Sequence, residues 1–266
     1  LYGRGSSDMK SAAAVEIIVF KELANILNYP IALQLVTDEE IGGFNGTKYQ
    51  IEQGVKTDLC IVGEPTNLMI NNESKGVMQL KLTSKGISAH SAKLWEGNNA
   101  IWEMYNFLNR LNKIYPRLSK SKWKTSINLA KISTTNTANN MVPNECEAIL
   151  DIRYISVDKN IDNEIKNILP SNFTMQILLK DPMQYSERNT KDMTTLCNSF
   201  KRNGVTPKFS KAHFATDLRH YTKLGYMAYS LGPIGNGLHT ENEWVNIEST
   251  HLYYKILCDF LKNINA

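Results

Sequence analysis

The chain has 266 residues, of which 42% are hydrophobic and 21% charged, and this composition is typical of a folded globular protein rather than of a disordered chain. Its net charge of +4 is too small an excess to indicate a nucleic-acid partner, and no apolar stretch reaches the ~20 residues of a membrane span. The four cysteines lie too far apart for a disulfide framework or a cysteine zinc site, so we expect a cytoplasmic protein.

The start of the chain predicts alternating helices and strands. Apolar residues at helical spacing follow Asp8, and this helix ends before Pro30. The pattern predicts a strand over 31–37, a short helix that ends near Gln53, and a nearly all-apolar strand over 58–62. This alternation favours a parallel sheet with helices on both faces.

From about Lys75 the pattern changes to that of a sheet with one solvated face, because apolar and polar residues alternate. Asn98 is the predicted N-cap of a helix that runs to Pro116. The elements expected after it are strands near 126–131, 145–155 and 173–179 and a helix near 158–169. The order strand, helix, strand, strand, helix, strand is that of a ferredoxin-like sandwich.

After Asp181 the first pattern returns, with helices predicted near 191–202 and 216–223, a strand over 226–231 and a closing helix from Glu248. We therefore expect an α/β protein in which one domain is inserted into another. The predicted larger domain comprises residues 1–75 and 181–266, and the inserted ferredoxin-like domain comprises residues 76–180.

One basic segment lies between Pro116 and Lys124, where four cationic side chains surround Trp123. Such a segment could follow phosphates while the aromatic ring stacks on a base. Nucleic-acid footprints normally recur on more than one element. We therefore expect a solvated loop and no nucleic-acid partner.

Polar groups that can carry chemistry lie where a predicted strand or turn meets the next element, at Asp8, Glu39-Glu40, Glu64 and His239. In open α/β sheets such junctions form binding sites. Carboxylates and an imidazole together can bind zinc, manganese or cobalt. Each residue also fits an ordinary role, such as a helix cap or a solvated turn, so spacing alone leaves both interpretations open.

Short motifs along nearly the whole chain carry a resemblance to a known family. They are Gly3-Arg4-Gly5-Ser6-Ser7-Asp8-Met9-Lys10, Asp38-Glu39-Glu40 with Gly42-Gly43 and Gly46, Gly63-Glu64-Pro65-Thr66, Gly86-Ile87-Ser88-Ala89-His90, Asn139-Asn140-Met141-Val142-Pro143, Asp151-Ile152-Arg153, Thr216-Asp217 and His239-Thr240-Glu241-Asn242-Glu243. In this order they resemble the co-catalytic zinc exopeptidase and deacylase family, which includes succinyl-diaminopimelate desuccinylase, acetylornithine deacetylase, aminoacylase and carboxypeptidase G.

The resemblance implies a site with two divalent metal ions, zinc first and cobalt or manganese as alternatives. Asp8 would bridge the two ions, Glu40 and His239 would complete the ligands of one, and Glu64 would bind the other. Glu39 would be the general base that takes a proton from the water activated by the ions and delivers it to the leaving amine.

The resemblance also assigns roles in the inserted domain. His90 would donate to the tetrahedral oxyanion, often from the partner subunit of a homodimer formed through this domain. Arg153 and Lys75 are candidates for the substrate's carboxylate, and the Asn139-Asn140 loop for further hydrogen bonds. Of the two, arginine suits a carboxylate better, because its planar guanidinium can bind both carboxylate oxygens and the lysine ammonium is a single point charge. Asp151 and Asp217 are expected to hold loops in place rather than to contact substrate.

The chain departs from the family at one ligand, because the His-x-Asp motif that precedes these motifs in the family has no counterpart here. The opening strands of the catalytic domain are also missing, so we expect an N-terminally truncated chain. Such a chain would bind at most one ion, at Asp8, Glu40 and His239, and hydrolyse little.

The expected activity is metal-dependent hydrolysis of a linear amide bond that removes an acyl group from an N-acyl amino acid, as in desuccinylases and deacetylases. A dipeptidase or carboxypeptidase of the same family is an alternative. Another is a non-catalytic binding protein that retains the fold. The presence of Glu39 counts against the last, because binding alone requires no base.

Overall fold

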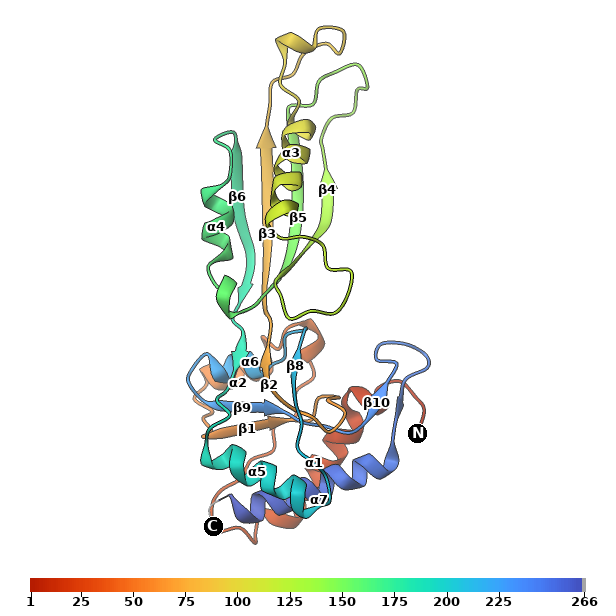
Figure 1. Ribbon diagram of the computed structural model, residues 1–266, viewed down its shortest axis with the longest axis vertical. Coiled ribbons are helices and arrows are strands. Elements are labelled where there is room, and N and C mark those ends of the chain that lie inside the picture. Colours follow the sequence, from red (N-terminus) through yellow and green to blue (C-terminus); the bar gives the residue numbers. More distant parts are fainter. Residues whose placement is uncertain (265–266) are drawn as a thin grey trace. The chain divides into compact units, whose positions relative to one another are not determined.

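A computed structural model of the chain describes residues 1–264 and divides them into two compact units (Figure 1). The first unit comprises Leu1–Ser74, Gln184–Ala212 and the segment that begins at Thr216. The second unit comprises Lys75–Met183 together with His213–Ala215. Each unit has its own hydrophobic core.

Helices and strands alternate along much of the chain. The helices are α1 (Ser11–Leu23), α2 (Thr47–Glu52), α3 (Ala100–Ile114), α4 (Ile161–Asn167), α5 (Lys191–Arg202), α6 (Leu218–Thr222) and α7 (Ile247–Asn263). The strands are β1 (Leu59–Val62), β2 (Ile70–Ser74), β3 (Gly76–Lys85), β4 (Ser126–Ser133), β5 (Glu145–Tyr154), β6 (Phe173–Asp181), β7 (Gln184–Tyr185), β8 (Phe209–Ala212), β9 (Met227–Ser230), β10 (Gly235–Asn236) and β11 (Trp244–Val245).

The sheet of the first unit is mixed rather than parallel. Its order is β1-β9-β2-β7, and β8 pairs with β2. The pairs β1–β9 and β2–β8 are parallel, whereas β2 runs antiparallel to β9 and β7. The expectation of a parallel sheet was therefore right for two of the pairs and wrong for the others, because β2 runs antiparallel to β9 and β7.

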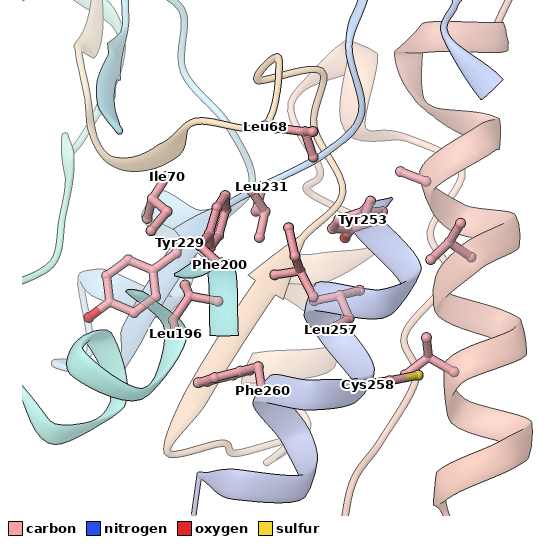
Figure 2. Packing of buried hydrophobic residues seen from close by; sticks show 14 of the residues in the cluster. Leu68, Ile70, Leu196, Phe200, Tyr229, Leu231, Tyr253, Leu257, Cys258 and Phe260 are labelled. Atoms are coloured by element: carbon pink, nitrogen blue, oxygen red, sulfur yellow. The ribbon is translucent and has the colours of Figure 1, made fainter. Parts of the chain in front are cut away.

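Helices cover both faces of this sheet, as predicted. On one face, α1, α5 and α7 pack in one buried cluster with Ile70, Tyr229 and Leu231 of the sheet region (Figures 1 and 2). On the other, α6 packs against β1 and β9 in a smaller cluster. Strand β1 shows why both faces are apolar: Leu59 and Ile61 contact the larger cluster, whereas the residues between and after them contact the smaller one.

The predicted strand over 31–37 does not form. These residues belong to no helix or strand in the structure. A strand is defined by its hydrogen-bonded neighbour, and among the described strands β1 pairs only with β9. In the described residues 1–264, segment 31–37 therefore has no hydrogen-bonded strand partner, despite its apolar pattern.

The second unit is a ferredoxin-like sandwich, which confirms the predicted order of elements. Its sheet has the order β4-β5-β3-β6, and all of its pairs are antiparallel. Alternate residues of β3, namely Met78, Leu80 and Leu82, are fully buried in one cluster with residues of α3 and α4. The intervening residues of β3 form the more exposed face.

The N-cap of α3 is Asn99 and not Asn98, so the prediction was wrong by one residue. The Asn99 Oδ1 atom accepts hydrogen bonds from the backbone N–H groups of Ile101 at 2.9 Å and Trp102 at 3.3 Å. The backbone of Asn98 is instead paired with that of Ile87 in both directions. Within residues 1–264 no helix has the length and apolar character that crossing a membrane requires.

Candidate metal and catalytic site

Three of the four predicted metal ligands converge in the first unit. Asp8, Glu40 and His239 each offer a ligand atom, and these atoms lie within 4.8 Å of one another. The His239 Nε2 atom is 3.0 Å from Asp8 Oδ2 and 3.2 Å from Glu40 Oε1. Residues from three separate loops therefore present two carboxylates and one imidazole to the same point.

The loop that carries Asp8 is held by Glu243, a residue to which the sequence assigned no role. The Glu243 carboxylate is 1% exposed and accepts backbone hydrogen bonds from Gly5 (2.9 Å), Ser7 (2.8 Å) and Asp8 (2.8 Å). Burial would raise its pKa, but these backbone donors outweigh burial and lower the pKa of Glu243 below its usual value. Because Glu243 follows His239 closely in the chain, one turn supplies a ligand and fixes the loop of another.

The turn that carries Glu39 and Glu40 is organised by the residue before it. One carboxylate oxygen of Asp38 accepts the backbone N–H groups of Asn45 at 2.8 Å and Gly46 at 3.0 Å, as aspartate commonly does in turns. Glu39 and Glu40 form a single helical turn. Glu40 is exposed and Glu39 is half-buried, so the two neighbours differ in their access to water.

The acidic groups of the site act on one another. Burial, followed by the charges of Asp217 and Glu40, raises the pKa of Glu39 to about 7, a value suited to a general base near neutral pH. Burial also raises the pKa of Glu64 well above its usual value, and the neighbouring charges of Glu39 and Asp8 add to this effect. Glu64 is 6% exposed and lies outside the three-ligand group, although the same carboxylates influence it.

His239 occupies an unusual backbone position. Its φ is +61°, in the left-handed region that non-glycine residues rarely adopt and that costs on the order of 1–3 kcal/mol. Such conformations persist where the surrounding structure holds them, and they cluster at functional sites. Here the conformation places the His239 imidazole against Asp8 and Glu40.

The chemistry of this donor set fits a divalent metal ion. Two carboxylates repel each other unless a cation or a proton lies between them, and the neutral imidazole adds a nitrogen ligand. Three protein ligands with a further position for water are the usual complement of a catalytic zinc. Asp8, Glu40 and His239 therefore suit zinc, manganese or cobalt.

The second unit brings His90 and the Asn139-Asn140 loop together. The backbone N–H of Ser91 donates to the Asn140 carbonyl at 2.9 Å, and His90 pairs with Met141 in an isolated bridge. The backbone N–H of Ala92 donates to His90 Nδ1 at 3.1 Å. In the neutral ring the proton then lies on Nε2, which is the form of histidine that can donate a hydrogen bond from an exposed position.

The two candidate cations for a substrate carboxylate have partners of their own. Arg153 forms two hydrogen bonds with Asp151, at 2.8 and 3.2 Å. Lys75 is 2% exposed, and its Nζ atom donates to the Lys124 carbonyl at 2.5 Å and lies 5.9 Å from the ring centroid of Trp123. Burial, followed by the charge of Arg153, lowers the pKa of Lys75. Within the second unit, Lys75 thus contacts the end of the basic segment 116–124.

Comparison with known proteins gives a family match over almost the whole chain. The family model described as peptidase family M20/M25/M40 matches residues 1–263. The succinyl-diaminopimelate desuccinylase of Pelagibacter ubique (strain HTCC1062) is 28% identical over 287 residues, which cover 99% of this chain and 74% of that protein. The enzyme of the same name from Buchnera aphidicola subsp. Acyrthosiphon pisum (strain Tuc7) is 28% identical and covers 99% of this chain and 75% of that protein.

Solved structures share the fold at lower identity. Aminopeptidase PepT from Bacillus cereus ATCC 10987 superposes with a TM-score of 0.79 at 14% identity and covers 97% of this chain and 71% of its own. The M20 family metallo-carboxypeptidase Sso-CP2 from Sulfolobus solfataricus has a TM-score of 0.72 at 18% identity and covers 99% and 77% of the two chains. The arrangement of helices and strands is therefore one that this aminopeptidase and this metallo-carboxypeptidase also adopt.

Proposed function

The chain belongs to peptidase family M20/M25/M40, and from this premise we propose which of its residues perform the reaction and on what substrate. It is a metal-dependent amidohydrolase that acts on acyl amino acids. The observation that best supports the assignment of residues is that ligand atoms of Asp8, Glu40 and His239 lie within 4.8 Å of one another. Glu39, the proposed base, directly precedes Glu40 in the chain.

The proposed ligands of the ion that this chain binds are Asp8, Glu40 and His239, and Asp8 and Glu64 are the proposed ligands of a second ion in the full-length enzyme. A bound divalent ion lowers the pKa of water and polarises the amide carbonyl. Zinc is the proposed metal, with cobalt or manganese as alternatives. Because three donors meet at one point in residues 1–264 and Glu64 lies outside that group, we propose that this chain binds one ion, at the site of the three donors.

Glu39 is the proposed general base. Its half-buried carboxylate takes the proton of the attacking water and delivers it to the leaving amine nitrogen, so that the C–N bond breaks as the amine becomes neutral. His90, whose Nδ1 accepts a hydrogen bond, can donate from Nε2 to the oxyanion that forms on the carbonyl.

The proposed substrate is an N-acyl amino acid with a free carboxylate, of the succinyl or acetyl class. Support comes from the two relatives named as desuccinylases and from the cations of the second unit. Arg153 presents a planar fork that suits a carboxylate, and Lys75 adds a buried positive charge beside it. Asn139 and Asn140 are exposed and can supply hydrogen bonds.

We further propose that residues 76–180 are an inserted lid and dimerisation domain of a cytoplasmic homodimer. The second unit carries large exposed aromatic side chains, including Trp95 (79% exposed), Trp102 (63%) and Tyr105 (54%). Exposed apolar groups of this size favour contact with another protein surface. A second copy of the chain is the proposed partner, with a two-fold axis relating the copies.

A set of glutamate variants in the full protein tests the assignment. Glu39→Gln should retain metal binding and lose roughly 10²–10⁴-fold in kcat, since glutamine has nearly the same shape but cannot accept the proton. Glu40→Gln should weaken metal binding. Glu52→Gln changes an exposed glutamate on α2 and should leave both properties unchanged.

The measurements are hydrolysis of a panel of N-succinyl and N-acetyl amino acids and dipeptides with added zinc, manganese or cobalt, and metal content after dialysis. A Glu39→Gln enzyme with nearly full kcat would remove Glu39 as the base. Preferential cleavage of dipeptides would replace the acyl amino acid substrate by a peptide.

A further inference from the structure

Three buried polar side chains near the start of α6 are not used by the proposed reaction. Asp217 and Arg219 are each 3% exposed and His220 is 7% exposed. Burying charged groups is costly unless they are paired and hydrogen-bonded. Their contacts therefore indicate what they hold in place.

The contacts lead to the turn that carries Glu39 and Glu40. The Arg219 Nη2 atom donates to the Gly42 carbonyl at 2.7 Å, and His220 Nε2 lies 3.3 Å from the same oxygen. Through Nη1, Arg219 also donates to the Thr216 carbonyl at 2.8 Å. One guanidinium thus joins the start of α6 to the end of the turn.

Asp217 also takes part in this attachment, through contacts with Arg219 and Gly43. Its Oδ1 is 3.5 Å from Arg219 Nη1, so the two buried charges compensate each other. A Cβ atom placed on Gly43, whose φ is +63°, would lie 2.1 Å from the same Asp217 oxygen. The carboxylate therefore packs directly on the backbone of Gly43, where only glycine fits.

Gly42 and Gly43 also stabilise the turn through backbone hydrogen bonds within it. The Gly42 N–H donates to the Glu39 carbonyl at 2.8 Å, and the Gly43 N–H donates to the Asp38 carbonyl at 2.8 Å. The carbonyl of Gly42 and the Cα of Gly43 are the points that Arg219 and Asp217 contact. Gly42 and Gly43 lie two to four peptide units from Glu40 and Glu39, and the Gly42 N–H bonds directly to the Glu39 carbonyl, so a movement at these points reaches both carboxylates. The charges of Asp217 and Arg219 also act on Glu39, in opposite directions.

We infer that Arg219, paired with Asp217, is a positioning residue that fixes the Glu39–Glu40 turn through the Gly42 carbonyl and so aligns both the base and a metal ligand. This inference rests on the proposed function, because it takes Glu39 and Glu40 as base and ligand. A buried ion pair that served only packing could be exchanged for apolar groups at little cost. This pair instead converges on the backbone next to the two functional carboxylates.

The test compares Arg219→Met and Arg219→Lys with the unaltered chain and with Arg202→Met as a matched control. Arg202 lies on α5 and pairs with Asp259, so this control removes a paired arginine elsewhere in the first unit. Hydrogen exchange of residues 38–46 in the metal-free chain measures the attachment itself. Titration with Co²⁺ alone, followed by its visible absorption bands, measures ligand alignment.

We expect exchange at Gly42 and Gly43 to rise about tenfold or more in Arg219→Met, as for loss of a hydrogen bond to a charged group. Cobalt should bind at least about tenfold more weakly and with altered absorption bands. Arg219→Lys keeps the positive charge, but its single ammonium group cannot reach both the Gly42 and the Thr216 carbonyl. Its exchange rates and cobalt affinity should therefore lie between those of Arg219→Met and those of the unaltered chain. Arg202→Met should match the unaltered chain.

The outcomes separate this inference from the proposed function. If the unaltered chain binds cobalt and a folded Arg219→Met variant shows the same exchange, affinity and bands, the inference is overturned and the proposed function stands. If the unaltered chain takes up no cobalt, the proposed metal site fails and the positioning role fails with it, even where exchange increases. Should Arg219→Met not fold, unchanged exchange and cobalt binding in Arg219→Lys would overturn the inference equally.

Discussion

At the scale of single residues, a partly buried acid that the reaction does not use, Glu16, lies beside the core of the first unit. Tyr253 is fully buried on α7, and its hydroxyl donates to Glu16 Oε1 on α1 at 2.9 Å. Burial raises the pKa of Glu16 to about 7, although the hydrogen bond from Tyr253 lowers it in part. The carboxyl group of Glu16 therefore holds its proton up to a higher pH in the folded chain than in the unfolded chain.

The pKa of Glu16 gives a signed prediction for Glu16→Gln. Because the folded pKa lies above the unfolded one, the contribution of Glu16 to stability is complete below about pH 4.5 and is lost as the pH rises through about 7. Glutamine accepts the same hydrogen bond without ionising. The variant should therefore be more stable than the unaltered chain at pH 8, by up to about 3 kcal/mol, and similar to it near pH 4.5.

Urea denaturation of both proteins at several pH values between 4.5 and 8 measures this difference. Glu52→Gln, which removes an exposed carboxylate, should give a difference that stays small and nearly constant with pH. If Glu16→Gln and the unaltered chain had parallel stability curves over the whole range, the raised pKa of Glu16 would be wrong.

The position of polar residues at the ends of strands and turns left the candidate site open, and the resemblance of the short motifs to a known family supplied the predicted roles. Asp8, Glu40 and His239 were named as ligands, and the structure brings these three together. Glu243 and Arg219 were not assigned roles, because both act on backbone groups of residues far away in the chain. Sequence patterns carry no direct record of such long-range contacts.

At the scale of secondary structure, the capping of α3 offers a comparison of two adjacent asparagines. The Asn99 side chain accepts two backbone hydrogen bonds at the start of the helix. Replacing such a cap by alanine typically costs about 0.5–2 kcal/mol. Asn99→Ala should therefore lower the free energy of unfolding of the second unit by about 1 kcal/mol.

Asn98→Ala is the natural control, because the Asn98 backbone pairs with Ile87 and alanine retains these bonds. It should change the stability of the second unit much less than Asn99→Ala does. Thermal denaturation with circular dichroism of both variants makes the comparison. The assignment of the cap to Asn99 would be contradicted by a larger loss of stability in Asn98→Ala.

The errors in predicted elements have physical causes that particular residues show. Strand β2 was missed because four of its five residues are polar, yet all five are buried. Asn72 donates through its side chain to the Ser186 carbonyl at 2.8 Å, and Glu73 pairs with Lys211 at 2.5 Å. These distant partners make burial possible. Segment 31–37 shows the opposite error. Its apolar pattern predicted a strand, but among the described residues it has no neighbouring strand to pair with and forms none.

At the scale of the whole molecule, the proposed catalytic groups are divided between the two units. Asp8, Glu39, Glu40 and His239 belong to the first unit, and His90 belongs to the second. The order of elements in the second unit was predicted correctly, since hydrophobic periodicity is a local property, whereas the order in the first unit was predicted only in part. The proposed homodimer would allow His90 of one subunit to serve the site of its partner.

Mixing two inactive variants of the full protein, His90→Ala and Glu39→Gln, tests this arrangement. If His90 acts across the dimer, each mixed dimer contains one site with both groups intact. Random exchange should then restore roughly one quarter of the activity, because half of the dimers are mixed and half of their sites are complete.

Native mass spectrometry of the mixture confirms that subunits have exchanged. Either variant mixed with itself should remain inactive. Full exchange without recovered activity would show that His90 does not act on the partner's site.

The separation of the proposed metal ligands along the chain has a consequence for biosynthesis. Asp8 and His239 contact each other across 231 residues, and Glu243, which holds the Asp8 loop, lies still further on. At the usual pace of translation, roughly ten to fifty seconds pass between the synthesis of the first ligand and the third. Throughout that interval the nascent chain presents unpaired acidic groups but no complete binding site. If these residues hold the ion as proposed, the ion can be bound only after His239 has been synthesised, and a chain that ends before His239 should bind it weakly or not at all.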